Sequence, residues 1–137
     1  MTAYKYKIIT DENIGSLAEL ADEAREEGYR FVAKAIEEWE TGKNRFDKAG
    51  EILYGAFSGE DCVAIGGLNI DPYQNSAEVG RVRHLYVSKA HRKKGIAYAL
   101  LDLIAAHAKE NFDVLRLSTD NDIAAHAYEK YGFKNLK

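Results

Sequence analysis

The alternation of hydrophobic and polar positions divides the first half of the chain into short strands and amphipathic helices. Positions 4 to 8 alternate between tyrosine or isoleucine and lysine, which predicts a strand. From residue 12 to 42 the apolar positions follow a helical period that is interrupted near Gly28, which predicts two consecutive helices. The β-rich runs 52–57 and 62–70 flank a short turn-rich spacer and predict a hairpin.

The second half continues with a strand from about residue 77 to 87, a helix over 93–111, a strand over 114–118 and a last helix over 122–131. The predicted order is therefore β-α-α-β-β-β-α-β-α, a mixed α+β arrangement. We find no internal repeat, linker or low-complexity segment, so residues 1–137 are expected to form a single domain.

Composition narrows the class of protein. The 137 residues are 46% hydrophobic with a net charge of -3, as expected of one soluble domain with a single core. The one cysteine, Cys62, excludes an internal disulfide framework and favours a reducing compartment. No stretch approaches the length of a membrane span and the first residues lack an apolar signal region, so we expect a cytoplasmic protein that binds no membrane.

Basic residues gather in one part of the chain. Residues 81–94 contain six Lys or Arg and no acid, so the remainder carries -3 minus 6, or -9. A cluster confined to one strand-loop-helix corner of an acidic chain disfavours nucleic-acid binding and suits a compact polyanion such as a nucleotide-derived cofactor. The chain has neither a Walker phosphate loop nor a G-x-G-x-x-G run after a strand.

The segment 92–97, Arg-Lys-Lys-Gly-Ile-Ala, lies where a strand passes into a helix. The N-terminus of a helix presents unpaired N–H groups and the positive end of the helix dipole. A glycine there lets an anion approach the backbone closely. The alternative is a solvated basic edge, which is what charge runs usually form. We therefore predict a phosphate site at residues 92–97.

Two motifs resemble the GNAT superfamily of acetyl-CoA-dependent N-acetyltransferases. Residues 92–97 resemble its pyrophosphate loop, R/Q-x-x-G-x-G/A, and residues 121–133 look like its second signature, N-x-x-A-x-x-x-Y-x-K-x-G-F. The similarity extends over nearly the whole chain. It implies a central, mostly antiparallel sheet flanked by helices, with acetyl-CoA (CoA) as the cofactor.

One departure from the family concerns the C-terminal strands. Relatives usually add a strand and often a hairpin after the Gly132-Phe133 turn, whereas only residues 134–137 follow here. We therefore expect truncated C-terminal strands: the sheet ends early, a second subunit supplies the missing edge, or the given sequence lacks its natural tail. An unpaired sheet edge favours a homodimer.

The resemblance also implies which residues bind the cofactor. The strand end before the loop would offer backbone groups to pantetheine, and the loop amides would hold the pyrophosphate, with Arg92 and Lys94 able to add charged contacts. Asn121 matches the family's cofactor-side asparagine, although helix capping alone would explain it. The expected cofactor-binding residues are Leu85, Tyr86, Val87, Arg92, Lys93, Lys94, Gly95, Ile96, Ala97, Asn121 and Tyr128.

Tyr128 is the expected general acid. On a helical wheel it lies toward one edge of the apolar face of the last helix, where a phenol can keep its hydroxyl available. The family's tyrosine at this position protonates the departing thiolate. With an ordinary pKa of about 10, a phenol is protonated at neutral pH and can serve as a donor. The alternative is a tyrosine that only packs.

The general base is not decided by the sequence. Some relatives carry a glutamate on the strand before the loop, but Arg81 occupies that place here. Glu78, His84 and Asp71 are the alternatives, and His84 ranks first because an unperturbed imidazole titrates near neutrality. A strand histidine that merely hydrogen-bonds a neighbour is an equally good interpretation. No histidine pair, nor Cys62 with a histidine, has metal-ligand spacing, so we predict no metal.

Acceptor recognition is expected from Trp39, Arg45, Phe46 and Tyr73, which combine aromatic surface with polar ends; Trp39 and Phe46 could equally be core. The resulting expectation is an N-acetyltransferase that moves an acetyl group to a primary amine, on a small molecule or a peptide, by direct attack. The alternative is a catalytically weak acyl-CoA-binding sensor or interaction domain.

Overall fold

The computed structural model describes residues 4–71, 79–116, 128 and 132. The described strands form one five-stranded sheet in the order β1-β2-β3-β4-β5. Strands β1 to β4 are antiparallel neighbours, and β4 pairs with β5 in parallel. This arrangement confirms the mixed α+β fold with a mostly antiparallel sheet.

The strands are β1 (Lys5–Ile8), β2 (Ile52–Ser58), β3 (Asp61–Ile70), β4 (Val79–Val87) and β5 (Val114–Arg116). The helices are α1 (Ala18–Glu26), α2 (Phe31–Thr41) and α3 (Ile96–Asn111), with short 3-10 turns η1 (Ile14–Leu17) and η2 (Lys89–His91). The predicted first strand, helix pair and hairpin all form. The predicted last helix lies outside the described residues except at Tyr128 and Gly132, where the Gly132 amide donates to the Tyr128 carbonyl at 3.1 Å.

Helix α3 begins later than predicted, at Ile96 rather than Lys93. Lys93 has a φ of 64° and Gly95 a φ of 81°, and both values lie in the left-handed region. A right-handed helix cannot include such residues. The chain therefore turns through residues 93–95 before the helix starts.

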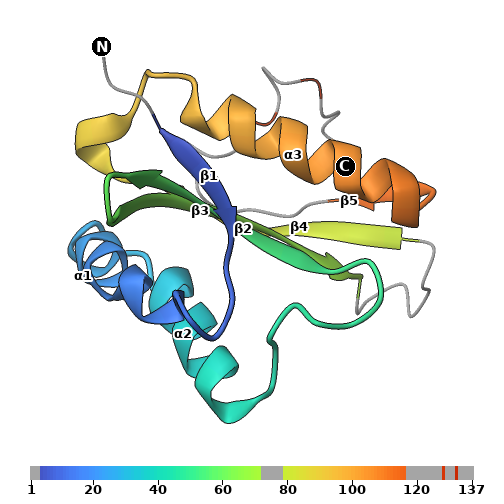
Figure 1. The fold of residues 1–137 in the computed structure, drawn as a ribbon, viewed down its shortest axis with the longest axis horizontal. Coiled ribbons are helices and arrows are strands. Elements are labelled where there is room, and N and C mark those ends of the chain that lie inside the picture. Colours follow the sequence, from blue (N-terminus) through green and yellow to red (C-terminus); the bar gives the residue numbers. More distant parts are fainter. Residues whose placement is uncertain (1–3, 72–78, 117–127, 129–131, 133–137) are drawn as a thin grey trace.

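Helices cover both faces of the sheet (Figure 1), with α3 on one face and α1 and α2 on the other. Each face has its own hydrophobic cluster. On the α3 face, Leu100, Leu101 and Ile104 pack against strand residues such as Leu68 and Leu85. The central strand β3 is buried on both sides because both faces are covered there, which explains its nearly continuous apolar run.

The opposite cluster contains Leu17, Leu20 and Val32 from the helical pair and its preceding turn, packed against Leu53 and Ile65 of the sheet. All five side chains are almost completely removed from solvent. Since burying a side chain of this size stabilises a fold by roughly 1.5–3 kcal/mol, this layer fixes α1 and α2 on the sheet.

Phe46 requires a glycine beneath it. Its ring packs against Gly67 of β3, where an added Cβ atom would lie 2.6 Å from Cε1 of Phe46. A contact under 3.0 Å forces the ring or the strand to move, and the ring is buried against other side chains. Gly67 is thus needed for space rather than for a special φ.

We therefore expect Gly67→Ala to lower the free energy of unfolding by about 1–3 kcal/mol through overpacking. Gly15→Ala is the matched control, because a Cβ there meets no atom within 4 Å. Gly15→Ala should leave the free energy of unfolding unchanged or raise it by about 0.4–1 kcal/mol, because alanine lowers the conformational entropy of the unfolded chain. Urea unfolding of both variants measures the difference, and equal stabilities would contradict this account of Phe46.

Candidate functional site

The predicted phosphate loop joins β4 to α3 and has an unusual backbone. Lys93 and Gly95 both adopt positive φ values, and Gly95 is the N-cap of α3 with no side-chain cap. The first helical hydrogen bond runs from the Ala99 amide to the Gly95 carbonyl at 3.0 Å. The amides that precede it are the donors that a helix leaves unpaired at its N-terminus. A Cβ at Gly95 would meet no protein atom within 4 Å, so this surface is open to a ligand.

The Arg92 side chain binds other protein groups instead of being free to contact a phosphate, as the sequence had suggested. Its Nη1 donates to Glu27 Oε2 at 3.1 Å and its Nη2 to Glu27 Oε1 at 2.6 Å, a bidentate ion pair. Its Nε donates to the Val87 carbonyl at 3.0 Å. Arg92 therefore fixes the start of the loop to α1 and to the end of β4. Lys93 and Lys94 are exposed and carry the loop's other side-chain charges.

Glu23 belongs to the same network, one helical turn before Glu27. Its Oε1 accepts from Ser88 Oγ and its Oε2 from the Lys89 amide, both at 2.8 Å. The Tyr86 hydroxyl donates to Glu23 Oε2 at 3.1 Å and also to Glu27. The two carboxylates thus hold the chain from the end of β4 to the beginning of the loop.

This network perturbs its own pKa values. The hydrogen bonds from Arg92 hold the pKa of Glu27 below its ordinary value, against the opposing effect of burial. Burial, followed by the hydrogen bond to Glu27, raises the pKa of Tyr86 far above that of a free phenol. At neutral pH both carboxylate and phenol keep the protonation states that the contacts require. Glu23 and Glu27 are not among the residues predicted from the sequence; the signal available for them was their i, i+4 spacing near the end of the first helix.

Strand β4 contains a bulge that the sequence did not reveal. Ile65 pairs with Tyr86 and Gly67 with Arg83, so His84 and Leu85 together oppose Gly66. His84 has a φ of 60°, which a residue with a Cβ seldom adopts. A bulge of this kind interrupts the regular ladder and redirects side chains. Here it separates the inner half of β4 from the end that leads to the loop.

The backbone beyond the bulge has no described pairing with β5. The described pairing of β4 with β5 ends at Arg81. Because the Ser88 amide donates to the Val63 carbonyl of β3 at 2.8 Å, the backbone groups of Val87 point to the opposite edge, where Arg92 reaches its carbonyl. Leu85 shares this orientation by the two-residue alternation. The residues expected to contact pantetheine therefore present part of their backbone at this edge.

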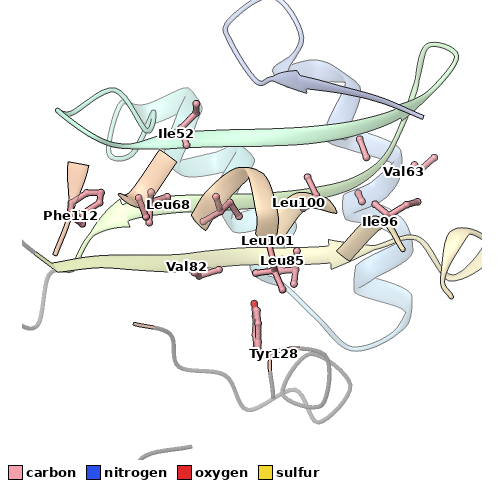
Figure 2. Packing of buried hydrophobic residues seen from close by; sticks show 14 residues of the cluster. Ile52, Val63, Leu68, Val82, Leu85, Ile96, Leu100, Leu101, Phe112 and Tyr128 are labelled. Atoms are coloured by element: carbon pink, nitrogen blue, oxygen red, sulfur yellow. The ribbon is translucent and has the colours of Figure 1, made fainter. Parts of the chain in front are cut away.

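Tyr128 lies beside this edge. Figure 2 shows its ring next to Leu85, with the hydroxyl directed toward β4, and both side chains belong to the cluster under α3. Only 5% of Tyr128 is exposed, so it is buried rather than placed at an open rim as the helical wheel suggested. Burial raises the pKa of Tyr128 well above 10. The phenol is consequently a proton donor throughout the neutral range.

His84, which the sequence favoured as the general base, has an environment that does not suit this role. Its ring is buried, and neither nitrogen has a hydrogen-bond partner among the described residues. Burial, and then the charges of Arg83 and Lys34, lower the pKa of His84 to about 3. Ranking His84 first assumed a pKa near neutrality, and that assumption is wrong here. The imidazole is neutral at pH 7 and is a poor proton acceptor.

Two of the expected acceptor-binding residues are core residues in this structure. Trp39 and Phe46 are each 6% exposed, and Trp39 Nε1 donates to Asp11 Oδ1 at 2.7 Å. Arg45 is exposed, but its Nε donates to the Trp39 carbonyl at 2.8 Å and so satisfies the end of α2. Of these residues, Phe46 alone comes near the candidate site, through the edge-on contact of its ring with His84 at 6.1 Å.

Three predicted site residues, Glu78, Tyr73 and Asn121, lie outside the described residues. Asp71, another alternative base, is 3% exposed at the end of β3. Across residues 4–71, 79–116, 128 and 132, no three His, Cys, Asp or Glu side chains could hold a metal ion together. Within the same ranges no helix has the length and apolar character needed to cross a membrane.

An open groove of about 840 Å³ lies along α1 and α2, away from the loop. None of the predicted site residues lines it. Its lining mixes small apolar side chains with charges of both signs and consists of Ala18, Ala21, Asp22, Arg25, Arg30, Ala33, Lys34, Ile36, Glu37, Glu40 and Thr41.

Crystal structures of acetyltransferases share this architecture. A candidate acetyltransferase from Exiguobacterium sp. 255-15 is 26% identical with a TM-score of 0.86, covering 98% of this chain and 87% of that one. A GNAT-family acetyltransferase from Staphylococcus aureus Mu50 is 22% identical with a TM-score of 0.78 and the same coverages, 98% and 87%. A predicted acetyltransferase from Clostridium acetobutylicum, solved with acetyl-CoA, is 19% identical with a TM-score of 0.70, covering 98% and 92%.

No curated protein sequence shows significant similarity to the chain. The model of the acetyltransferase (GNAT) family, however, matches residues 15–133, which include the phosphate loop, the bulged strand and Tyr128. This span is most of the chain, and the sheet order and helix placement agree with the solved structures. The protein therefore belongs to the GNAT family of acetyltransferases.

Proposed function

We propose that this protein transfers the acetyl group of acetyl-CoA to a primary amine by direct attack, with Tyr128 as the general acid. The observation that carries the proposal is the proximity of three features around one strand. The start of α3, which has no side-chain cap, follows β4. The bulge interrupts the pairing of β4 with β3, and the buried Tyr128 packs beside Leu85 of the same strand. Together they form an anion site, a backbone recognition edge and a proton donor.

The residues present fit the pyrophosphate of CoA. Lys93 and Gly95, both with positive φ, direct successive amides toward one side of the loop, as backbone sites for anions do. The space above Gly95 is free of protein atoms, and the dipole of α3 favours negative charge there. Lys93 and Lys94 add positive charge. Arg92 acts indirectly, since its guanidinium holds the loop rather than the ligand.

When bound, acetyl-CoA supplies an activated thioester. In the transfer a nitrogen–carbon bond forms and the carbon–sulfur bond breaks, so the sulfur needs a proton and the amine nitrogen must lose one. Tyr128 holds a proton at neutral pH because burial raises the pKa of its hydroxyl, and it can give that proton to the sulfur. Backbone N–H groups at Leu85 and Val87 can polarise the thioester carbonyl, an effect worth about 3 kcal/mol in oxyanion holes.

The amine arrives at a site without a well-tuned histidine base. The pKa of His84 is about 3, so its imidazole removes protons poorly from an alkylammonium group. An α-amine with a pKa of about 7.8 is neutral in roughly one molecule in seven at pH 7, whereas an alkyl amine near 10.4 is almost fully protonated. The acceptor that fits this site best therefore carries an amine of low pKa. Homodimer formation and a cytoplasmic location stay predictions.

The proposal as a whole is tested by an acetyl-CoA turnover assay that detects the free thiol, with amino acids, peptides, polyamines and aminoglycosides as acceptors. Acetylation of at least one amine class, confirmed by mass spectrometry of the product, is expected. Tight CoA binding without turnover on any amine would instead favour the sensor or interaction domain.

Gly95→Asp should weaken CoA binding by at least about ten-fold, because it places a carboxylate against the pyrophosphate, a loss of about 1.4 kcal/mol or more. Gly42→Asp is a matched control, since Gly42 has φ 82° and ψ 4° and Gly95 has φ 81° and ψ 7°. Both variants carry the same backbone strain, but only one lies in the loop. Calorimetric titration with CoA compares them; equal affinities would contradict the assignment of the loop.

Glu27→Gln should weaken CoA binding on the order of ten-fold, because a neutral amide cannot keep the bidentate ion pair that positions the loop. Glu26→Gln removes the same charge from the exposed neighbouring position and should have no effect. The pKa of Glu27 is lowered by folding, so its contribution is complete at neutral pH and is lost as the pH falls below the ordinary carboxyl value of 4.5. Identical CoA affinities of the two variants at pH 7 would refute the positioning role.

Tyr128→Phe should lower kcat by about 10- to 1,000-fold with little change in CoA affinity, because it removes the proton donor and keeps the ring. Tyr54→Phe makes the same change in a half-buried tyrosine that packs against the same cluster, and it should leave kcat unchanged. Steady-state kinetics with a saturating acceptor provide the measurement. Turnover of Tyr128→Phe at the wild-type rate would show that Tyr128 only packs.

A further inference from the structure

His84 is a buried polar side chain without a hydrogen-bond partner in the described part of the chain. It is 9% exposed, and neither Nδ1 nor Nε2 has a hydrogen bond there. Buried polar atoms are nearly always hydrogen-bonded, so each exception calls for an explanation. The bulge in β4 holds this ring in place at a backbone conformation that costs stability. A ligand that reaches the ring would supply the missing hydrogen bonds.

Aromatic rings confine the imidazole on two sides. The centroid of the Phe31 ring, at the start of α2, lies 6.2 Å from the centroid of the imidazole, and the two ring planes form an angle of 31°. The centroid of the Phe46 ring lies 6.1 Å from the imidazole centroid, and the angle between the two ring planes is 72°. These contacts place His84 in the layer between the sheet and α1–α2, opposite the face that α3 covers. The rings exclude water without offering a polar partner.

The charged groups that act on this ring are cationic. Arg83 precedes His84 on β4 and pairs in register with Gly67, the glycine beneath Phe46. Lys34 lies one helical turn after Phe31 on α2. Both exert an electrostatic effect on the imidazole. Among the described residues neither cation forms an ion pair within 4.0 Å, in contrast to Arg92 with Glu27.

We infer that His84, Arg83 and Lys34 bind a carboxylate carried by the acceptor amine. This inference rests on the proposed function and names its substrate class: an amino acid or a peptide whose amine and carboxylate both enter the site. Leu85, which follows His84 directly, presents its backbone at the edge where the acetyl group would be delivered. The carboxylate would therefore be held next to the reacting centre but on the α1–α2 side of the strand.

The chemistry of the three groups agrees with this ligand. A neutral imidazole can donate one N–H to a carboxylate oxygen, and two cations supply the attraction that a buried anion needs. The pKa of about 3 keeps the ring neutral at pH 7, so its role is hydrogen bonding rather than charge. The same cations repel a polyamine, which would bring further positive charge to the site.

The test compares each acceptor with its own carboxamide. Glycine, β-alanine, lysine and glycylglycine are assayed beside their amides for kcat/KM with acetyl-CoA, so that each pair differs only at the carboxylate. We expect the carboxylate of at least one pair to be favoured at least ten-fold. The length of the best acceptor distinguishes an amino acid from a peptide. Equal or better turnover of the amides throughout would overturn the inference and leave the proposed acetyl transfer intact.

Arg83→Gln should raise KM for the favoured carboxylate at least ten-fold while its amide is unaffected, with kcat nearly constant for both. Lys109→Gln, an exposed position on α3 at the opposite face of the sheet, is the control and should change neither. His84→Asn is a second variant that tolerates the left-handed backbone and should also reduce the preference. A carboxylate preference that survives in Arg83→Gln and His84→Asn would overturn the assignment to these residues.

A binding measurement separates this inference from the proposed function. The ring nitrogens of His84, in protein labelled with ¹⁵N-histidine, are followed by NMR during titration with glycylglycine and with glycylglycine amide. Saturable shifts with the acid alone support the carboxylate site even if no acetyl transfer occurs, in which case the proposed function fails by itself. Absence of shifts with the acid, together with turnover of amides, would refute the carboxylate site while acetyl transfer stands.

Discussion

The bidentate ion pair between Glu27 and Arg92 is the interaction on which the candidate site depends. It ties the end of α1 to the first residue of the phosphate loop, across 65 positions of sequence. The same guanidinium reaches the Val87 carbonyl, and Glu23 adds contacts to Ser88 and Lys89. A loop with two left-handed residues in three has few regular hydrogen bonds of its own, so it needs such external contacts to keep its amides directed at one ligand.

This network also assigns different tasks to neighbouring cations. Arg92 is held in a partly buried ion pair, whereas Lys93 and Lys94 remain exposed beside the open helix start. An arginine suits the structural task because its planar guanidinium matches a carboxylate in two hydrogen bonds. Lysines would suit the proposed contact with the pyrophosphate, because their flexible, strongly hydrated ammonium groups can adjust to the position of a phosphate. One basic run therefore contains Arg92, which holds the loop in place, and two exposed lysines that are proposed to attract an anion.

The bulge in β4 divides the site into two layers. Beyond it, Leu85 and Tyr128 pack in the cluster under α3, on the side of the cofactor loop. At it, His84 lies between aromatic rings in the layer under α1 and α2. Successive side chains of a strand point to opposite faces, so His84 and Leu85 reach different layers, and the bulge places both of them opposite Gly66 of β3. Under the proposed function, the acetyl donor and the acceptor would approach this strand from opposite faces.

Local pattern by itself determined the order of the described strands and helices and the position of the loop. Alternation and helical period depend on burial of one face, and they predicted the first strand, the helix pair and the hairpin. Gly95 marked the end of the loop because a glycine before an apolar helical run is a local signal. The two motifs, at residues 92–97 and 121–133, indicated the family, since their spacing follows from the chemistry of one cofactor.

Tertiary structure alone decided the roles of the side chains. The sequence suggested Arg92 as a phosphate ligand, yet its guanidinium forms an ion pair with Glu27, a residue far away in the sequence. His84 reads as a base, yet burial lowers its pKa to about 3. Trp39 and Phe46 read equally well as a binding wall or as core, and only packing distinguishes these cases. Ion pairing, desolvation and close packing all depend on which residues meet across the fold, and that information is absent from any local pattern along the chain.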